Sequence, residues 1–311
     1  MKKLIFTLLM TMATPAHADI ETANKAHDEE NYRLAFGEYL NEAKAGNTEA
    51  MVMVGLYYAD GLHVMKSDEK ANEWMLKAAE LGDPIAQRNM GIGYKFGLGN
   101  LTKDEEKAFS WFEQAAKQNE LDSQFELASA YHYGIGTKTN LDEARLWYMK
   151  AADAGDSRAQ YNLASMYASG DGVAQDDTVA NMWLEKAAEQ NNHEALFTMG
   201  LINHNGDQGG QDFAAAADYF ERAFIEGKAE AASYMAEYAY LGSDRDKDPV
   251  EALMWIMLGT EISSTMPGGQ LSPQTLKRLQ QNRSFLEDEL SDEQVNEAKQ
   301  RFDAFMKDRL Q

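Results

Sequence analysis

The 311-residue sequence has no cysteine and only five prolines. The lack of cysteine excludes disulfide frameworks, thiol nucleophiles and thiolate metal sites. The scarcity of proline leaves long stretches free to form uninterrupted helices. Basic residues are also few, since 29 Lys and Arg stand against 51 Asp and Glu, and the formal net charge is −22. We therefore expect no nucleic-acid partner, and a basic or uncharged partner surface fits better than an anionic membrane.

Long hydrophobic runs are also missing. Two lysines precede an apolar run over residues 4–12, which is shorter than the roughly 20 residues that a transmembrane helix needs. Ala16-His17-Ala18 then provides the small residues of a cleavage site. This order is typical of a secretory signal peptide. We expect residues 1–18 to be removed after Ala18 and the rest to lie in the periplasm, or to be secreted, without membrane insertion.

What the sequence has in abundance is self-similarity. A glycine recurs every 36 or 37 residues, as Gly61, Gly97, Gly134, Gly170, Gly206 and Gly242. An aromatic residue keeps step with it, as Trp74, Trp111, Trp147, Trp183, Tyr219 and Trp255. Apolar residues at helical spacing precede each glycine and surround each aromatic residue, so each period encodes two helices joined by a glycine turn. All five tryptophans stand in this column, which predicts core positions for them.

Small residues define how the helix pairs stack. They recur in the first helix as Ala50, Ala86, Ser123, Ala159, Ala195 and Ala231, and in the second as Ala71, Ala108, Ala144, Ala180, Ala216 and Ala252. Small side chains let neighbouring helices approach closely. One pair cannot bury its apolar face alone, whereas stacked pairs can. The sequence therefore predicts an all-α fold, an α/α solenoid (superhelix) of six helix-turn-helix repeats.

The repeats run over residues 48–262. Residues 19–47 match only the second-helix columns and predict an N-terminal capping helix pair. After residue 262 the period fails, and residues 264–272 have the composition of a loop. Ser272-Pro273 and the pair Ser291 and Gln294 then mark two helix starts, the second as a capping box. Residues 263–311 are therefore expected to form a C-terminal helical cap.

These columns resemble the Sel-one-like repeat family, a relative of the tetratricopeptide repeat. One repeat shows Ala159, Leu163-Ala164, Tyr167, Gly170, Gly172, Asp176, Ala180, Trp183 and Lys186-Ala187-Ala188. The resemblance implies a superhelix of antiparallel helix pairs that scaffolds protein complexes and is not an enzyme, often in bacterial envelopes or signalling. Some cysteine-rich relatives have been linked to β-lactam binding or hydrolysis. A cell-wall or β-lactam-active hydrolase is therefore the alternative prediction, although this chain lacks their cysteines.

Candidate chemistry is sparse. The histidines lack the spacing of a zinc motif, so we expect no metal or cofactor. Ser67 and Lys70 match a Ser-x-x-Lys motif, but Ser67 stands where a helix-capping residue is expected. The segment from Gly134 to Thr139 is rich in glycine and threonine, yet no predicted strand precedes it, which argues against a phosphate-binding loop. We therefore expect no catalytic residues.

The remaining functional signal is aromatic. By analogy with tetratricopeptide superhelices, the first helix of each pair lines a concave face. Its exposed positions hold Phe125, Tyr161 and Phe197 in consecutive repeats, with Phe96, His132, Tyr133, Leu201 and His204 nearby. Aromatic residues on a rigid surface are good anchors for a protein or peptide. The sequence predicts a scaffold for envelope assembly, signalling or virulence that binds through this face; alternatively, these aromatic residues pack against the neighbouring helix.

Overall fold

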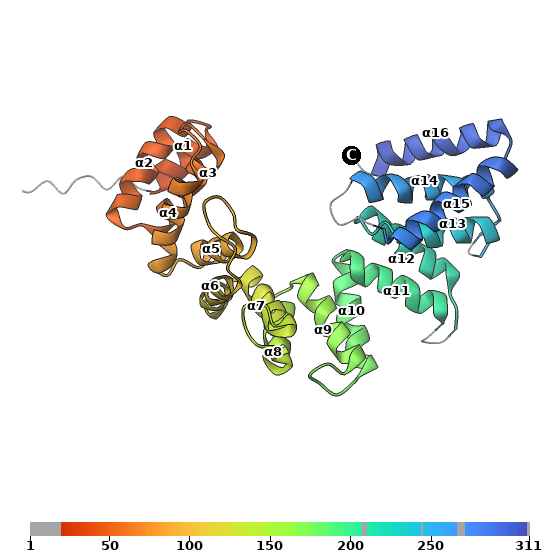
Figure 1. Ribbon diagram of the computed structural model, residues 1–311, viewed down its shortest axis with the longest axis horizontal. Coiled ribbons are helices and arrows are strands. Elements are labelled where there is room, and N and C mark those ends of the chain that lie inside the picture. The colour runs from red at the N-terminus through yellow and green to blue at the C-terminus, as the bar shows by residue number, and fades with distance from the viewer. Residues whose placement is uncertain (1–19, 207–209, 244, 266–270, 310–311) are drawn as a thin grey trace, which may run out of the picture. The chain divides into compact units, whose positions relative to one another are not determined.

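The computed structural model describes residues 20–206, 210–243, 245–265 and 271–309, and the predicted signal peptide lies outside them. Throughout this part of the chain the regular structure is helical, which confirms the all-α prediction (Figure 1). The helices are α1 (Ile20–Asp28), α2 (Tyr32–Ala45), α3 (Thr48–Asp60), α4 (Asp68–Glu80), α5 (Pro84–Phe96), α6 (Glu105–Lys117), α7 (Leu121–Tyr133), α8 (Leu141–Asp153), α9 (Ser157–Ser169), α10 (Asp177–Glu189), α11 (His193–Asn205), α12 (Phe213–Ile225), α13 (Ala231–Leu241), α14 (Pro249–Thr265), α15 (Pro273–Glu289) and α16 (Asp292–Arg309). Among the described helices, none combines the length and apolar character needed to cross a membrane.

The chain divides into two compact units, residues 1–147 and 148–311, with the division inside α8. In the first unit, α1 packs on α2, α3 on α4 and α5 on α6, and each pair contacts the next first helix along the chain. In the second, α9 packs on α10, α11 on α12 and α13 on α14, and both α15 and α16 pack on α14. These helix pairs are the repeats of the predicted solenoid. α1 and α2 precede them in the chain and α15 and α16 follow them, where the sequence predicted the caps.

Every first helix ends at its predicted glycine. These six glycines have φ between +68° and +80°, a left-handed conformation that other residues rarely adopt. Each turn is then closed in the same way, because the backbone N–H of the residue capping the second helix donates to a carbonyl of the first helix. The pairs, 2.7–3.0 Å apart, are Ser67 with Tyr58, Asp104 with Tyr94, Asn140 with Tyr131, Asp176 with Tyr167, Asp212 with Asn203 and Asp248 with Ala239.

Two boundaries follow from local chain chemistry. The loop over residues 97–104 holds the extra residue of the second repeat, so the insertion leaves α5 and α6 intact, as the register of later repeats requires. At the other end, α14 continues to Thr265, although the sequence predicted a loop from residue 264. Nothing in residues 257–265 breaks a helix except Gly259, which α14 accommodates, and the first proline stands only at 267. Residues 266–270 of the predicted loop lie outside the described part.

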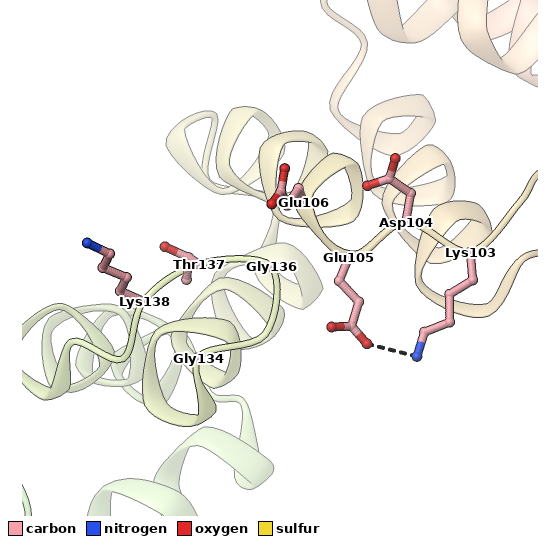
Figure 2. A pocket seen from close by; sticks show the side chains of 8 residues that line it. All are labelled: Lys103, Asp104, Glu105, Glu106, Gly134, Gly136, Thr137 and Lys138. Atoms are coloured by element: carbon pink, nitrogen blue, oxygen red, sulfur yellow. Dashed lines mark ion pairs between the residues drawn. The ribbon is translucent and has the colours of Figure 1, made fainter.

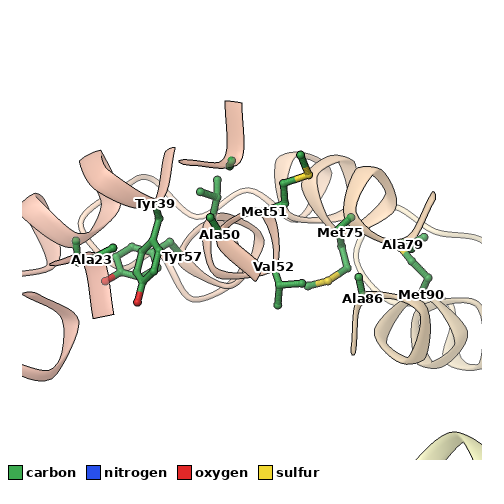
Figure 3. Close-up of a cluster of buried hydrophobic side chains, with 14 of the residues drawn as sticks. Ala23, Tyr39, Ala50, Met51, Val52, Tyr57, Met75, Ala79, Ala86 and Met90 are labelled. Carbon is green, nitrogen blue, oxygen red and sulfur yellow. The ribbon is translucent and has the colours of Figure 1, made fainter. Parts of the chain in front are cut away.

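The core is made of repeated small and large side chains. The small column of the first helices, Ala50 through Ala231, is completely buried in all six repeats. Figure 3 shows the core of the first unit, where Tyr39, Tyr57, Met75 and Met90 pack around such alanines. Close approach of the helices thus leaves room for large residues between them.

Three of the five tryptophans in this column are less buried than predicted. Trp74, Trp111 and Trp147 are only half-buried, whereas the next residue in each repeat, such as Met75 or Phe112, is buried. In two repeats a lysine three residues on lies over the ring: Lys77 Nζ is 4.5 Å from the centre of the half-buried Trp74 ring, and Lys186 Nζ is 4.0 Å from that of the buried Trp183 ring. A single-helix periodicity marks both neighbouring positions as apolar and does not distinguish the deeper one.

Tyr39 makes the N-terminal cap sensitive to high pH. Its side chain is 1% exposed, and its hydroxyl donates to Asn24 Oδ1 at 2.7 Å. Burial, followed by the neighbouring Tyr57, Asp28 and Glu49, raises the pKa of Tyr39 to about 12. Because the pKa of Tyr39 in the folded state lies above the value of 10.0 that a tyrosine has in water, this stabilisation is complete below pH 10 and is lost as the pH rises towards 12.

We therefore expect Tyr39→Phe to lower the free energy of unfolding by about 1 kcal/mol at neutral pH, because the hydrogen bond to Asn24 is lost. Between pH 9 and pH 11 the variant should lose less stability than the wild type. Denaturant unfolding across that range measures both effects. A parallel decline of the two proteins would show that Tyr39 ionisation does not limit alkaline stability.

Candidate interaction surface

The most exposed aromatic side chains of the predicted set are Phe96 and Tyr133. Each is the last residue of a first helix, α5 or α7, and each is 62% exposed. His132 stacks on the Tyr133 ring with centres 4.5 Å apart and planes 10° apart, and Lys95 Nζ lies 5.3 Å from the Phe96 ring centre. Consecutive repeats of the first unit therefore present an aromatic ring at the same position, immediately before the turn glycine.

Polar contacts fix the two helices that carry these rings. Lys95 on α5 pairs with Glu126 on α7 at 2.6 Å. At the other end of α5, Arg88 pairs with Glu120 and Asp122 at 3.3 and 3.0 Å. Partly exposed ion pairs of this kind add little stability, but they join α5 to the residues at the start and in the middle of α7. Phe96 and Tyr133 thus lie on two helices that are joined by ion pairs.

The other predicted residues of the first unit lie deeper or beside these rings. Phe125 and His132, both on α7, are half-buried. We call Phe96, Phe125, His132 and Tyr133 the first-unit aromatic surface. It gathers aromatic residues from α5 and α7.

In the second unit, Phe197 and His204 on α11 take part in packing between repeats. The Phe197 ring centre lies 5.5 Å from that of Phe220 and 5.8 Å from that of Tyr234. His204 Nδ1 lies 2.7 Å from the Tyr238 hydroxyl, and the two rings stack. The structure thus places these two side chains against α12 and α13. This is the alternative from the sequence, in which the aromatic residues pack against a neighbouring helix.

Tyr161 on α9 and Leu201 on α11 are half-buried as well. The eight predicted residues therefore belong to two units, four to each. A single concave groove through all eight remains a prediction, whereas the first-unit aromatic surface is defined within one unit.

A polar cleft of about 960 Å³ also lies in the first unit, between the start of α6 and the loop after α7 (Figure 2). It contains Asp104, Glu105 and Glu106, and Glu105 pairs with Lys103 at 2.8 Å. Figure 2 shows Lys138 directed away from Glu105. Three carboxylates around the cleft oppose phosphate binding, so the glycine-rich loop here serves the fold.

The Ser67 and Lys70 pair has the geometry of a helix cap. Ser67 Oγ accepts a hydrogen bond from the backbone N–H of Lys70 at 3.3 Å, at the start of α4. The Lys70 ammonium instead lies 5.1 Å from the Tyr58 ring centre. Nothing in this arrangement activates the serine hydroxyl. In the described part of the chain, His, Asp and Glu side chains nowhere gather in threes that could hold a metal ion.

Comparison with known proteins identifies the repeat. Segments 48–83, 84–120, 121–156, 157–192, 193–227 and 229–256 each match the Sel1 repeat. A Sel1 repeat protein from Oxalobacter formigenes has a solved structure that is 27% identical, with a TM-score of 0.71, and the match covers 83% of this chain and 100% of that one.

Two further proteins resemble the chain, one over most of its length and one over a short segment. The c5321 protein, a protective antigen of uropathogenic Escherichia coli strains with an SLR fold, is 22% identical with a TM-score of 0.67, over 93% of this chain and 67% of that one. HRD3A of Arabidopsis thaliana, an ERAD-associated E3 ubiquitin-protein ligase component, is 37% identical over 76 residues, which are 24% of this chain and 11% of that protein. The chain thus spans about a tenth of that relative. Since the six matched repeats cover most of the 311-residue chain, the protein belongs to the Sel1 repeat family.

Proposed function

We propose that this Sel1 repeat protein is a scaffold that binds a protein or peptide through the first-unit aromatic surface. The observation that carries the proposal is the 62% exposure of both Phe96 and Tyr133 at equivalent positions of consecutive repeats. Exposed aromatic rings on a fixed frame lose little conformational freedom on binding, and such residues dominate binding energies at interfaces. In the second unit, Tyr161, Phe197, Leu201 and His204 remain candidate contact residues within that unit alone.

The chemistry of the partner follows from the charge. With a formal net charge of −22, the protein attracts partners that are basic around an apolar or aromatic contact. HRD3A, whose name describes a component of a larger ligase, is consistent with a role in assemblies. The signal-like residues 1–18 support a place in the periplasm.

Replacing Phe96 and Tyr133 together by serine tests the surface. The fourth repeat has Ser169 at the position that Phe96 and Tyr133 occupy in the second and third repeats, so the fold should tolerate serine at both. Loss of one aromatic anchor at an interface typically costs about 2 kcal/mol, which is a factor of about 30. We therefore expect the double variant, which loses two anchors, to bind the partner at least about 30-fold more weakly than the wild type. Crosslinked pull-downs from the periplasmic fraction, followed by titration of the purified partner, measure this loss.

Met65→Ser is the matched control, because Met65 is an almost fully exposed apolar residue of the same unit outside this surface. The control should keep wild-type affinity. Full retention of the partner by the Phe96 and Tyr133 variant, or equal loss with Met65→Ser, would contradict the proposed surface.

A further inference from the structure

The last repeat and the C-terminal cap enclose an apolar pocket that the proposed function does not use. The pocket has a volume of about 280 Å³ and lies between α13, α14 and α15 in the second unit. Its floor is formed by buried side chains, among them Ala236, Ile256, Leu279 and Leu286. Because the floor is apolar, water gains few hydrogen bonds there, and an apolar side chain would fill the space favourably.

The pocket follows from how the cap helix sits on the last repeat. α15 packs on α14. The contact is close at Gly259 of α14, because a Cβ added to this glycine would lie 3.4 Å from Leu279 Cδ1 of α15. At the other end, Phe285 of α15 meets Tyr240 of α13 only by an edge contact, with ring centres 6.4 Å apart. Small side chains at Ala236 and Ala252 leave the space beneath unfilled. The pocket is thus a property of the cap and of this repeat together.

The apolar surface continues beyond the mouth of the pocket. Leu241 and Phe285 line it and remain 60% and 49% exposed. A small ligand held inside the pocket would leave these two side chains in water. A peptide that places one side chain in the pocket would cover them with its flanking residues, which favours a peptide as the occupant.

The polar residues of the rim define the chemistry of that peptide. Arg278 and Asn282 lie four residues apart and so share one face of α15, while Glu237 faces the pocket from α13. Within the described part of the chain, Arg278 is exposed and forms no ion pair. In a protein with a net charge of −22, an unpaired guanidinium beside an apolar pocket is a local site for a carboxylate. Asn282 and Glu237 can hydrogen-bond to a peptide backbone.

We propose that this pocket binds a peptide segment in which a large apolar residue is followed by an acidic one. The apolar side chain fills the space above Ile256 and Leu279, and the acidic side chain pairs with Arg278. The site is separate from the first-unit aromatic surface, so the protein can hold two different segments. The Phe96 and Tyr133 double variant should therefore bind this peptide like the wild type.

Two blocked, fluorescein-labelled peptides test the proposal, Gly-Ser-Trp-Asp-Ser-Gly and Gly-Ser-Trp-Lys-Ser-Gly. Fluorescence anisotropy with the full chain should show saturable binding of the aspartate peptide, about fivefold or more tighter than the lysine peptide. Arg278→Glu should reverse this preference. Lys277→Glu is the matched control, because it makes the same charge change one residue away, outside the pocket, and should change the affinity less than twofold.

Ala236→Phe tests the contribution of the pocket without changing Arg278. The phenylalanine ring would fill the space where the tryptophan of the peptide would bind. This variant should abolish binding of the aspartate peptide while circular dichroism shows unchanged helix content. If Ala236→Phe unfolds the protein, Ile256→Ala, which enlarges the pocket, should change the relative affinities for peptides with leucine and tryptophan. Equal effects of Arg278→Glu and Lys277→Glu, or no saturable binding of the aspartate peptide, would overturn the proposal.

Discussion

Replacing Gly136 by alanine is expected to lower the free energy of unfolding of the first unit by about 3 kcal/mol or more. Gly136 has φ +66°, and a Cβ there would lie 2.0 Å from the backbone oxygen of Glu105. A left-handed conformation alone costs a non-glycine residue about 1–2 kcal/mol, and overpacking against backbone costs about 1–3 kcal/mol more. Because Glu105 begins α6 of the preceding repeat, the change should separate two repeats.

Gly82→Ala is the matched control for this experiment. Gly82 also has a positive φ, +97°, but a Cβ there would meet no atom within 4 Å. This control should therefore carry only the conformational cost, about 1–2 kcal/mol. Thermal and denaturant unfolding of the two variants measure the difference. Equal destabilisation by both substitutions would show that the contact of Gly136 with α6 does not hold the repeats together.

The two turn glycines of a repeat show what the sequence could and could not predict. Gly134 ends a helix, and this role depends on its neighbours in the chain, so periodicity alone predicted it and its five equivalents. The contact of Gly136 is with Glu105, about 30 residues earlier, and depends on how two repeats pack. The sequence predicted Gly136 as part of the turn that breaks the helix, but not its contact with the preceding repeat.

The same distinction applies to the candidate surface. The register of the first helices put Phe125, Tyr161 and Phe197 at exposed positions, and all three are half-buried. Phe96 and Tyr133, which the sequence placed nearby, are exposed. The sequence assigned Phe197 and His204 to the same face, but Tyr234 and Tyr238 of the following repeat contact them. A pattern within one helix describes the direction of a side chain and not the residues that the next helix places there. The pocket beneath α15 could not be predicted from the sequence for a similar reason, because residues from three helices form it.

The largest cost in the second unit is expected for Phe220→Ala, which should lower the free energy of unfolding by about 3–5 kcal/mol. Phe220 is completely buried, and its ring stacks on Tyr234 with centres 4.5 Å apart. Its ring also contacts Phe197, so the substitution leaves a cavity lined by residues of α11 and α13. Denaturant unfolding measures the loss. A cost below about 1 kcal/mol would mean that the surrounding aromatic rings collapse into the space.

A cycle with Gly200 tests the packing that explains this cost. A Cβ on Gly200 would lie 2.6 Å from the Phe220 ring, so Gly200→Ala alone should cost about 1–3 kcal/mol through overpacking. The fourth repeat has Ala164 and Leu184 at the equivalent positions, both buried. Combining Gly200→Ala with Phe220→Leu copies that pair, and the double variant should lose at least about 1 kcal/mol less than the sum of the two single changes. Additive costs would show that glycine and phenylalanine at these positions are not packed as a pair.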